Sequence, residues 1–345
     1  MIMSARAGVG LCALAATFAL PAAAQAAGLS VTGNDGKPLA VTEGATAQIR
    51  YMAPKLTPTF SGSAGRYSLG VKNPKGDDAG ASVSCQDISS AAPTDAIEYS
   101  GNGTYTATLT TYADDSDLSC LNPTTTQTFS FAITAGTVVH APGSTLMNRK
   151  PGGDEISHRF SVDINPGAGT YDLAWRLNAP PGFTPDQGHF DSQGFDPPSA
   201  AGDIELLTPG IYTFWGRANA GNGSSPWSAP VMVKVIGPFD FTGAPAIHSA
   251  GRSKYELSET VTDGKEAVGT TIAISIAKGK GPFKPLGKAK IDKNGDFDFF
   301  FKKKGSGRYR IRYSYAGSNL VAKGAWIQGI TLGRRLSADP TLKKG

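Results

Sequence analysis

The chain has 345 residues and a formal net charge of +5, with 18% charged residues and abundant glycine (43) and proline (23). This length allows two or three domains, and the composition suits many short strands joined by turns. After about the first twenty residues, no stretch keeps a helical apolar period over three turns, which argues against a helical protein.

The first 26 residues have the pattern of a secretory signal peptide. Arg6 supplies a positive start, residues 7–20 form an apolar core, and Ala24-Gln25-Ala26 fits a small-x-small cleavage site. A membrane anchor is the alternative, but the apolar run is shorter than the roughly 18 residues that a span needs. We therefore expect a secreted or cell-envelope protein with no transmembrane span in its mature chain.

Residues 27–136 are predicted to form a first β-sandwich. A turn at residues 43–46 leads into Ala47-Gln48-Ile49-Arg50-Tyr51, which resembles the B strand of an immunoglobulin-like domain. Once Cys12 leaves with the signal peptide, Cys85 and Cys120 remain, and in an exported protein this pair is expected to form a disulfide rather than two free thiols.

A Gly-x-Tyr sequence opens a strand-like stretch three times, at residues 103–105, 210–212 and 307–309. The repeats lie 107 and 97 residues apart, close to the roughly 100 residues of one β-sandwich domain. We therefore predict an all-β chain of three tandem immunoglobulin-like or fibronectin type III-like β-sandwich domains, each organised around this late strand. In immunoglobulins the second bridge cysteine follows the corner tyrosine by two residues. Ala107 stands there, so Cys85–Cys120 is not that bridge.

Residues 137–236 are predicted to form the second domain. The strand at 171–177 alternates large apolar residues with polar or small ones and places Trp175 in the core. Residues 212–235 resemble the last two strands of a fibronectin type III domain. The longest loop, 179–202, is rich in Pro, Gly and Asp.

Residues 237–336 are predicted to form the third domain, followed by a disordered tail at 337–345. A strand at 269–277 has three inward isoleucines, and Asn294-Gly295 marks a hairpin turn before an aromatic strand. The domain resembles the bacterial immunoglobulin-like modules repeated in cell-surface proteins. The residues that carry this resemblance are Gly307, Tyr309, Arg312, Tyr315, Gly317 and Ser318.

Charge is distributed unevenly along the chain, with −7 over residues 27–237 and +11 over residues 238–345. The basic part suggests an anionic partner, such as a cell-surface polymer, or another surface protein. A solvated sheet face whose charges prevent strands from pairing edge to edge is the alternative. Specific nucleic-acid binding is not expected in an exported chain, because the sequence has no RRM, OB-fold or helix-turn-helix pattern. The candidate residues are Lys288, Lys290, Lys302, Lys303, Lys304, Arg308, Arg310 and Arg312.

Together these patterns predict an exported, non-catalytic protein with an adhesion-type binding or spacer role at a cell surface. Two other functions are the alternatives. Trp215 and Trp227, with the long loop, could stack on sugar rings in a carbohydrate-binding accessory protein, although packing tryptophans are the simpler interpretation. The other rival is a hydrolase, but the chain has no recognisable catalytic motif, so we predict no enzyme activity.

We expect no cofactor and no metal site. His189, Asp191 and Asp196 fit no zinc spacing. Asp292-x-Asn294-x-Asp296 resembles the start of a calcium loop, but Phe297 and Lys303 stand where that loop needs Gly and Glu.

Overall fold

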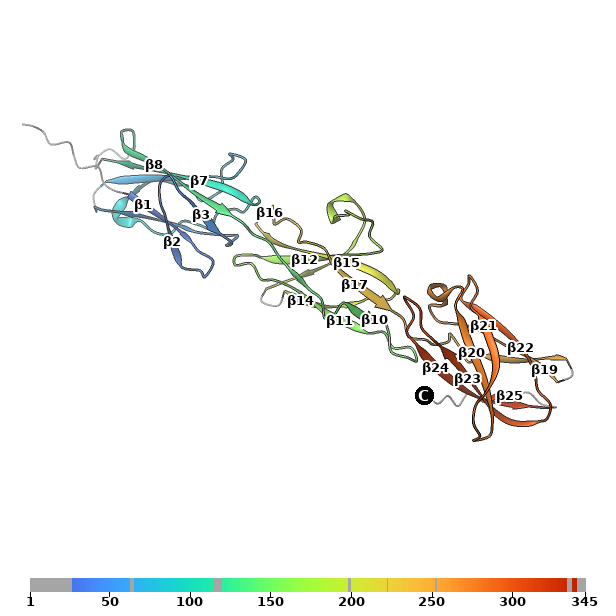
Figure 1. Ribbon diagram of the computed structural model, residues 1–345. Helices are drawn as coiled ribbons and strands as arrows, with labels where there is room; N and C mark the ends of the chain where they lie inside the picture. Colours follow the sequence, from blue (N-terminus) through green and yellow to red (C-terminus); the bar gives the residue numbers. More distant parts are fainter. Residues whose placement is uncertain are drawn as a thin grey trace, which may run out of the picture.

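The structure is a computed structural model that describes residues 27–62, 65–113, 120–197, 200–221, 223–251, 253–333 and 337–339. The predicted signal peptide and residues 340–345 of the predicted tail lie outside this part of the chain. Within it, the strands form six sheets that follow one another in three pairs along an extended molecule (Figure 1).

The first pair of sheets is made of residues 27–133. The small sheet has the order β2-β1-β4, and the large sheet has the order β3-β8-β7-β5-β6. The strands are β1 Ala27–Thr32, β2 Pro38–Val41, β3 Thr46–Ile49, β4 Leu56–Phe60, β5 Arg66–Lys72, β6 Val83–Asp87, β7 Gly103–Tyr112 and β8 Pro123–Ile133.

The second pair is made of residues 139–236. The small sheet has the order β14-β11-β9, and the large sheet has the order β10-β17-β15-β12-β13, with β16 paired to β15. The strands are β9 Val139–His140, β10 Thr145–Met147, β11 Ser157–Val162, β12 Thr170–Leu177, β13 Asp191–Phe195, β14 Ala201–Glu205, β15 Gly210–Ala220, β16 Gly223–Ser224 and β17 Val231–Ile236.

The third pair is made of residues 246–339. The small sheet has the order β18-β19-β22, and the large sheet has the order β21-β20-β23-β24-β25. The strands are β18 Ala246–Gly251, β19 Lys254–Thr260, β20 Thr271–Lys278, β21 Lys284–Lys290, β22 Asp296–Lys302, β23 Gly307–Tyr315, β24 Gly324–Leu332 and β25 Ser337–Asp339. Strand β25, at the start of the predicted tail, pairs with β24.

The Gly-x-Tyr strand has the same place in every large sheet. Strand β7 lies between β5 and β8, β15 between β12 and β17, and β23 between β20 and β24. This order, with a small sheet packed opposite, is that of an immunoglobulin-like or fibronectin type III-like β-sandwich. The all-β prediction is confirmed.

Glycine and tyrosine have separate roles in this repeat. Gly103 and Gly307 adopt φ values of 144° and 130°, which favour glycine, and a Cβ at Gly210 would lie 2.3 Å from Leu177. The tyrosine is buried in all three strands. In β7 its hydroxyl donates to the Gly101 carbonyl at 3.1 Å and accepts from the Ser100 N–H at 2.9 Å, which fixes the chain entering the strand.

The apolar core is continuous through the first two pairs of sheets, and the third pair has a core of its own. At the first junction the Met52 N–H donates to the Pro166 carbonyl at 2.8 Å. Gly223 lies against the Tyr99 backbone, where an added Cβ would lie 2.3 Å from the carbonyl oxygen. Trp175 is only partly buried and packs at the rim of this core, with its ring centre 6.3 Å from that of Phe214. The prediction that Trp175 lies within the core is therefore wrong.

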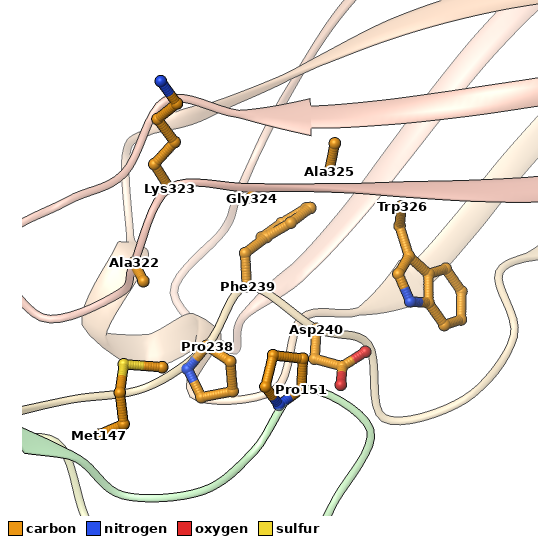
Figure 2. Close-up of a pocket in the computed structure, with 10 residues that line it drawn as sticks. All are labelled: Met147, Pro151, Pro238, Phe239, Asp240, Ala322, Lys323, Gly324, Ala325 and Trp326. Carbon is orange, nitrogen blue, oxygen red and sulfur yellow. The ribbon is translucent and has the colours of Figure 1, made fainter. Parts of the chain in front are cut away.

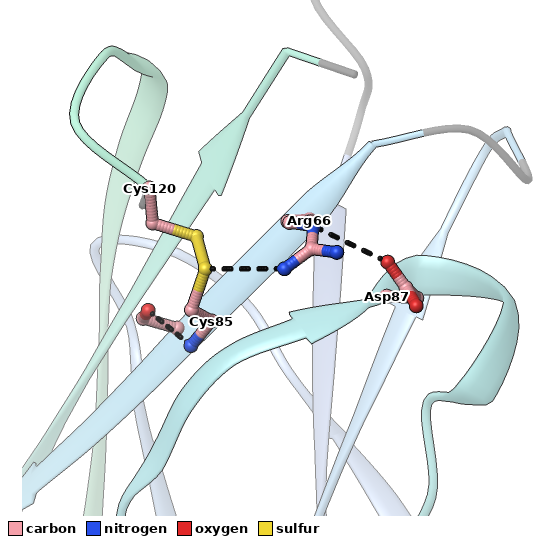
Figure 3. Close-up of a disulfide and its surroundings, with 5 residues drawn as sticks. Arg66, Cys85, Asp87 and Cys120 are labelled. Atoms are coloured by element: carbon pink, nitrogen blue, oxygen red, sulfur yellow. Dashed lines mark hydrogen bonds and ion pairs between the residues drawn. A yellow bond between two sulfur atoms is a disulfide. The ribbon is translucent and has the colours of Figure 1, made fainter. Parts of the chain in front are cut away.

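The predicted disulfide joins Cys85 on the edge strand β6 to Cys120, ahead of β8 (Figure 3). Both cysteines therefore belong to one large sheet and its loops, as expected for a bridge other than the one between immunoglobulin sheets. Arg66 on β5 lies beside the bridge, with Nη1 3.7 Å from the Cys85 sulfur and Nε 3.4 Å from Asp87 Oδ1.

Removing the bridge should destabilise the first sandwich. In the chain-entropy relation, a closed loop with a sequence separation of 35 residues contributes about 4 kcal/mol. We expect Cys85→Ala/Cys120→Ala to lower the free energy of unfolding of this part by that order, as measured by urea denaturation followed by tyrosine fluorescence. An unchanged transition would contradict a stabilising role for the bridge.

Candidate functional sites

Strand β23 turns tyrosine and isoleucine inward and arginine outward. Tyr309, Ile311 and Tyr313 are buried, whereas Arg308 and Arg312 are exposed. Because side chains alternate along a strand, the three arginines share the outer face of the sheet, as the sequence predicted. Burial raises the pKa of the Tyr313 hydroxyl above its usual range, and this hydroxyl donates to Gln328 Oε1 at 3.2 Å inside the core.

Two lysines of edge strand β21 face the same side as these arginines. Lys288 pairs with Ala273, Arg312 pairs with Ser275, and directly opposite residues of adjacent strands point to the same face. No ion pair to any of the five cations is found among the described residues. We call these five residues the outer basic face: Lys288, Lys290, Arg308, Arg310 and Arg312.

Position in the sheet separates the two explanations of this charge. Lys288 and Lys290 lie on an edge strand, where charge can prevent pairing with another chain. Strand β23 is the third of five strands and both of its edges are paired. Edge protection therefore does not explain the three arginines.

Arg310 is held by the turn between β20 and β21. Its Nε donates to the Gly279 carbonyl at 2.8 Å and its Nη2 to the Gly281 carbonyl at 3.0 Å. Its guanidinium also lies 4.9 Å from the centre of the Phe283 ring, and that of Arg312 lies 5.9 Å from it. Arg310 therefore orders the turn that carries Lys278 and Lys280.

The three remaining predicted cations lie elsewhere. Lys302 ends β22 in the small sheet, opposite Lys254 on β19. The Lys303 ammonium lies over the Tyr309 ring at 5.5 Å, and Lys304 is exposed. The predicted cluster of eight thus divides into the outer basic face and a group at the end of the sandwich.

The sequence analysis did not recognise how many basic turns meet at this end. Because Lys254 pairs with Lys302 and Lys278 with Tyr309, the turns at 253–254, 279–283 and 303–306 lie together. None of their described residues is acidic. The cations at this end are Lys254, Lys278, Lys280, Lys284, Lys302, Lys303 and Lys304.

The second sandwich has an aromatic pocket of about 460 Å³ on the outer face of its large sheet. Trp215 lines this pocket, and Phe183 from the long loop packs against the Trp215 ring with the two ring centres 5.6 Å apart. The loop leaves Trp215 only 2% exposed, so this ring is packed and the alternative in which it stacks on a sugar has no free face there. The pocket is lined by Ala179, Pro180, Pro181, Gly182, Phe183, Thr184, Thr213, Trp215, Trp227, Ser228, Pro230 and Met232.

Trp227 borders the same pocket and is fixed on three sides. Its Nε1 donates to Asp186 Oδ1 at 3.0 Å, the Arg217 guanidinium lies 4.3 Å from its ring, and Phe190 meets it edge-on at 6.0 Å. The structure therefore brings together the two tryptophans and the long loop that the sequence singled out, with Trp227 the more accessible of the two rings.

A second cavity, of about 300 Å³, lies between the second and third sandwiches (Figure 2). Met147 and Pro151 line it from one side, and Phe239 and Trp326 from the other. Asp240 at its edge is 8% exposed, and its carboxylate accepts hydrogen bonds from the Gly152 and Phe241 N–H groups.

An ion pair between Arg149 and Asp263 crosses this junction. Both side chains are largely buried, and Asn148 donates to the Leu207 carbonyl at 2.8 Å beside them. The Asn148 Oδ1 and the Arg149 Nε have no hydrogen-bond partner among the described residues. The second junction therefore combines an apolar cavity with a buried ion pair, whereas the apolar core is continuous across the first junction.

Two kinds of feature were not found in the part of the chain that the structure describes. The described residues contain no group of three or more His, Cys, Asp or Glu side chains that could hold a metal ion. Among the same residues, no helix is both long and apolar enough to cross a bilayer.

Comparison with known proteins gave one kind of match. No protein-family model matches the chain, and no curated protein matches it. Among solved structures, the chain is similar to the crystal structure of the chicken CNTN1 FN1–FN3 domains, with 13% sequence identity and a TM-score of 0.21. The match covers 84% of this chain and 97% of the chicken chain.

The contacts of Arg310 lead to a test of its role. Arg310→Lys keeps the charge but loses the fork of donors that holds two carbonyl groups. We expect faster backbone hydrogen exchange in residues 279–283, by about fivefold for about 1 kcal/mol of lost contacts. Arg308→Lys, at an exposed position on the same strand, is the control and should leave that exchange unchanged. Equal exchange in both variants would show that Arg310 does not order the turn.

The buried ion pair leads to a second test. Arg149→Met leaves the Asp263 carboxylate without its cation, so we expect the free energy of unfolding of the third sandwich to fall by about 3 kcal/mol. Arg159→Met is the matched control, because its ion pair with Asp203 is exposed and should contribute less than about 1 kcal/mol. Urea denaturation measures both, and a similar small loss in each would contradict a structural role for the buried pair.

Proposed function

We propose that this is an exported, non-catalytic protein of the surface or adhesion type, which binds an anionic cell-surface partner through its third sandwich. The observation that supports this proposal is the row of three arginines on an interior strand, turned to solvent and free of acidic partners among the described residues. Arg310 orders a turn, but Arg308 and Arg312 are exposed and form no ion pair among the described residues, so their charge contributes little to stability and a binding role is its simplest explanation.

The extended arrangement of the sandwiches suits such a role. The three pairs of sheets follow one another in a line, and the basic turns lie at the end of the third pair that faces away from the second (Figure 1). In this proposal the domains at 27–136 and 137–236 space the basic domain at 237–336 from whatever holds the other end. The pattern of residues 1–26 supports secretion.

The partner is proposed to be a polyanion such as a cell-wall polymer. Several exposed cations that each contribute little bind a repeating polyanion well, because each contact releases counterions. Such binding weakens steeply with salt. The net charge of +11 over residues 238–345 also attracts a polyanion over several ångströms beyond contact.

A second candidate function is carbohydrate binding at the aromatic pocket. The observation that favours it is the meeting of Trp227, Phe183 and the hydroxyl-bearing Thr184, Thr213 and Ser228 in one cavity. Aromatic rings with adjacent polar groups are the usual surface for a sugar ring. The lining carries no charged side chain, so this ligand would be neutral and its binding insensitive to salt.

Charge removal tests the proposed function. Neutralising Lys288, Lys290, Arg308 and Arg312 to Gln should weaken binding to immobilised anionic wall polymer at least about tenfold at about 0.15 M salt, and flatten the dependence of binding on salt. The matched control neutralises four exposed lysines of the first sandwich and gives the same net charge. Those residues are Lys37, Lys55, Lys72 and Lys75.

Equal losses in the two variants would mean that only net charge matters, which contradicts a binding face. Salt-insensitive binding of neutral glycans that is lost in Trp227→Ala would instead support the second candidate.

A further inference from the structure

A line of small residues runs along the outer face of β20. Thr271, Ala273, Ser275 and Ala277 point outward, because Ile272 and the isoleucines that follow it are buried. No outward side chain of this strand up to residue 277 is larger than threonine. The neighbouring strands carry long cations at staggered levels, with lysines of β21 beside Thr271 and Ala273 and arginines of β23 beside Ser275 and Ala277. At each level the surface is therefore lower along β20 than on the side that carries the cation. We call this line of residues the β20 trough.

Cations stand on both banks of the trough. On the β21 side, Lys290 pairs with Thr271 and Lys288 with Ala273. On the β23 side, Arg312 pairs with Ser275 and Arg310 with Ala277. The cations of the two banks are therefore at successive levels along β20, separated by about 7 Å per level.

The dimensions suit one extended chain. Adjacent strands lie about 4.8 Å apart, so the backbones of the two banks are separated by about 10 Å. The four outward positions of β20 span about 20 Å. Ala277 is 2% exposed whereas Thr271 and Ala273 are exposed, so the trough is open toward Thr271 and closed near the turn that holds Phe283.

The chemistry of the banks favours phosphate. The guanidinium of Arg312 presents a planar fork of donors that matches two oxygens of a phosphate group. The ammonium groups of Lys288 and Lys290 act as point charges on the other bank, one and two levels further along β20. The described residues of β20, β21, β23 and β24 include no acidic side chain that would repel an anion.

We propose that the β20 trough holds a single strand of an unbranched, phosphate-bearing polymer, with successive phosphates contacting first the lysines of the β21 bank and then Arg312 of the β23 bank. This inference rests on the proposed function and adds to it the class and the conformation of the partner. The polymer lies along β20, with the ordered turn at Arg310 closing one end of its path.

Filling the trough without changing any charge tests this. The variant Ala273→Leu/Ser275→Leu in the full mature chain raises the floor between the banks. The probe is fluorescently labelled long-chain inorganic polyphosphate, with binding followed by anisotropy at about 0.15 M salt. We expect the variant to bind about tenfold more weakly, because phosphates held above the floor lose contact with one bank.

The matched control makes the same two changes on the other face of the same sandwich. Ala246 and Ser258 pair directly on the small sheet, and Ala246→Leu/Ser258→Leu should bind polyphosphate as the unchanged protein does. A small-for-small swap, Ala273→Ser/Ser275→Ala, should also leave binding unchanged. Far-ultraviolet circular dichroism and thermal unfolding of all variants show whether the fold is kept. If the leucines disturb it, the comparison of single-stranded and duplex probes on the unchanged protein still tests the site.

The outcomes separate this inference from the proposed function. If the filled variant binds as tightly as the unchanged protein while the four-glutamine variant does not, the trough is wrong and the basic face stands. If neither variant loses binding, both proposals fail.

Two further probes test the class of partner. A single-stranded oligonucleotide should bind more tightly than the duplex of the same sequence, although the duplex has the higher charge density, because only a single chain enters the trough. Tighter binding of the duplex would overturn the single-strand inference. Heparin bound more tightly than polyphosphate at equal charge would overturn the assignment to phosphate.

Discussion

The burial of one face of the Gly-x-Tyr strand is the constraint on which the rest of each sandwich depends. In β23 the inward Tyr309, Ile311 and Tyr313 remove a large aromatic and aliphatic surface from water, which fixes the orientation of every other residue. A slip of one residue would bury three guanidinium groups, at a cost far above the stability of a domain. The outward direction of the arginines is therefore set by the tyrosines.

The sequence pattern predicted the features that are set locally, such as which side chains of a strand face inward and which face outward. The alternation over residues 307–315 predicted both faces of β23, and the cysteine count, taken with the expected export, predicted the bridge. The register of β23 against β20 and β21 was not predictable, because it depends on long-range pairing and on the irregularity between Ile274 and Ser275. For that reason the sequence showed a cluster of cations but not the small residues between them.

The two tryptophans show what a strand pattern reports and what it leaves out. Trp215 does lie on the outer face of its sheet, as its alternation with Phe214 predicted. The loop that begins at residue 179 folds back over that face, and Phe183 covers the ring. A single strand pattern reports which side a residue faces, but it carries no information on whether a distant loop covers that side. The same pattern put Trp175 on the inner face but did not show how deeply it is buried: Phe160 and Phe214 stack in the core, and Trp175 packs against Phe214 while only partly buried.

The bridge in the first sandwich has a mechanical consequence. Cys85 and Cys120 are 35 residues apart in sequence, and the segment between them includes β7, the central strand of its sheet. When a chain is pulled by its two ends, residues enclosed by a covalent loop do not lengthen with the rest. When unfolded and fully extended, the first sandwich would therefore be about 120 Å shorter than the same chain without the disulfide. The disulfide therefore shortens the fully extended length of any chain that contains this sandwich.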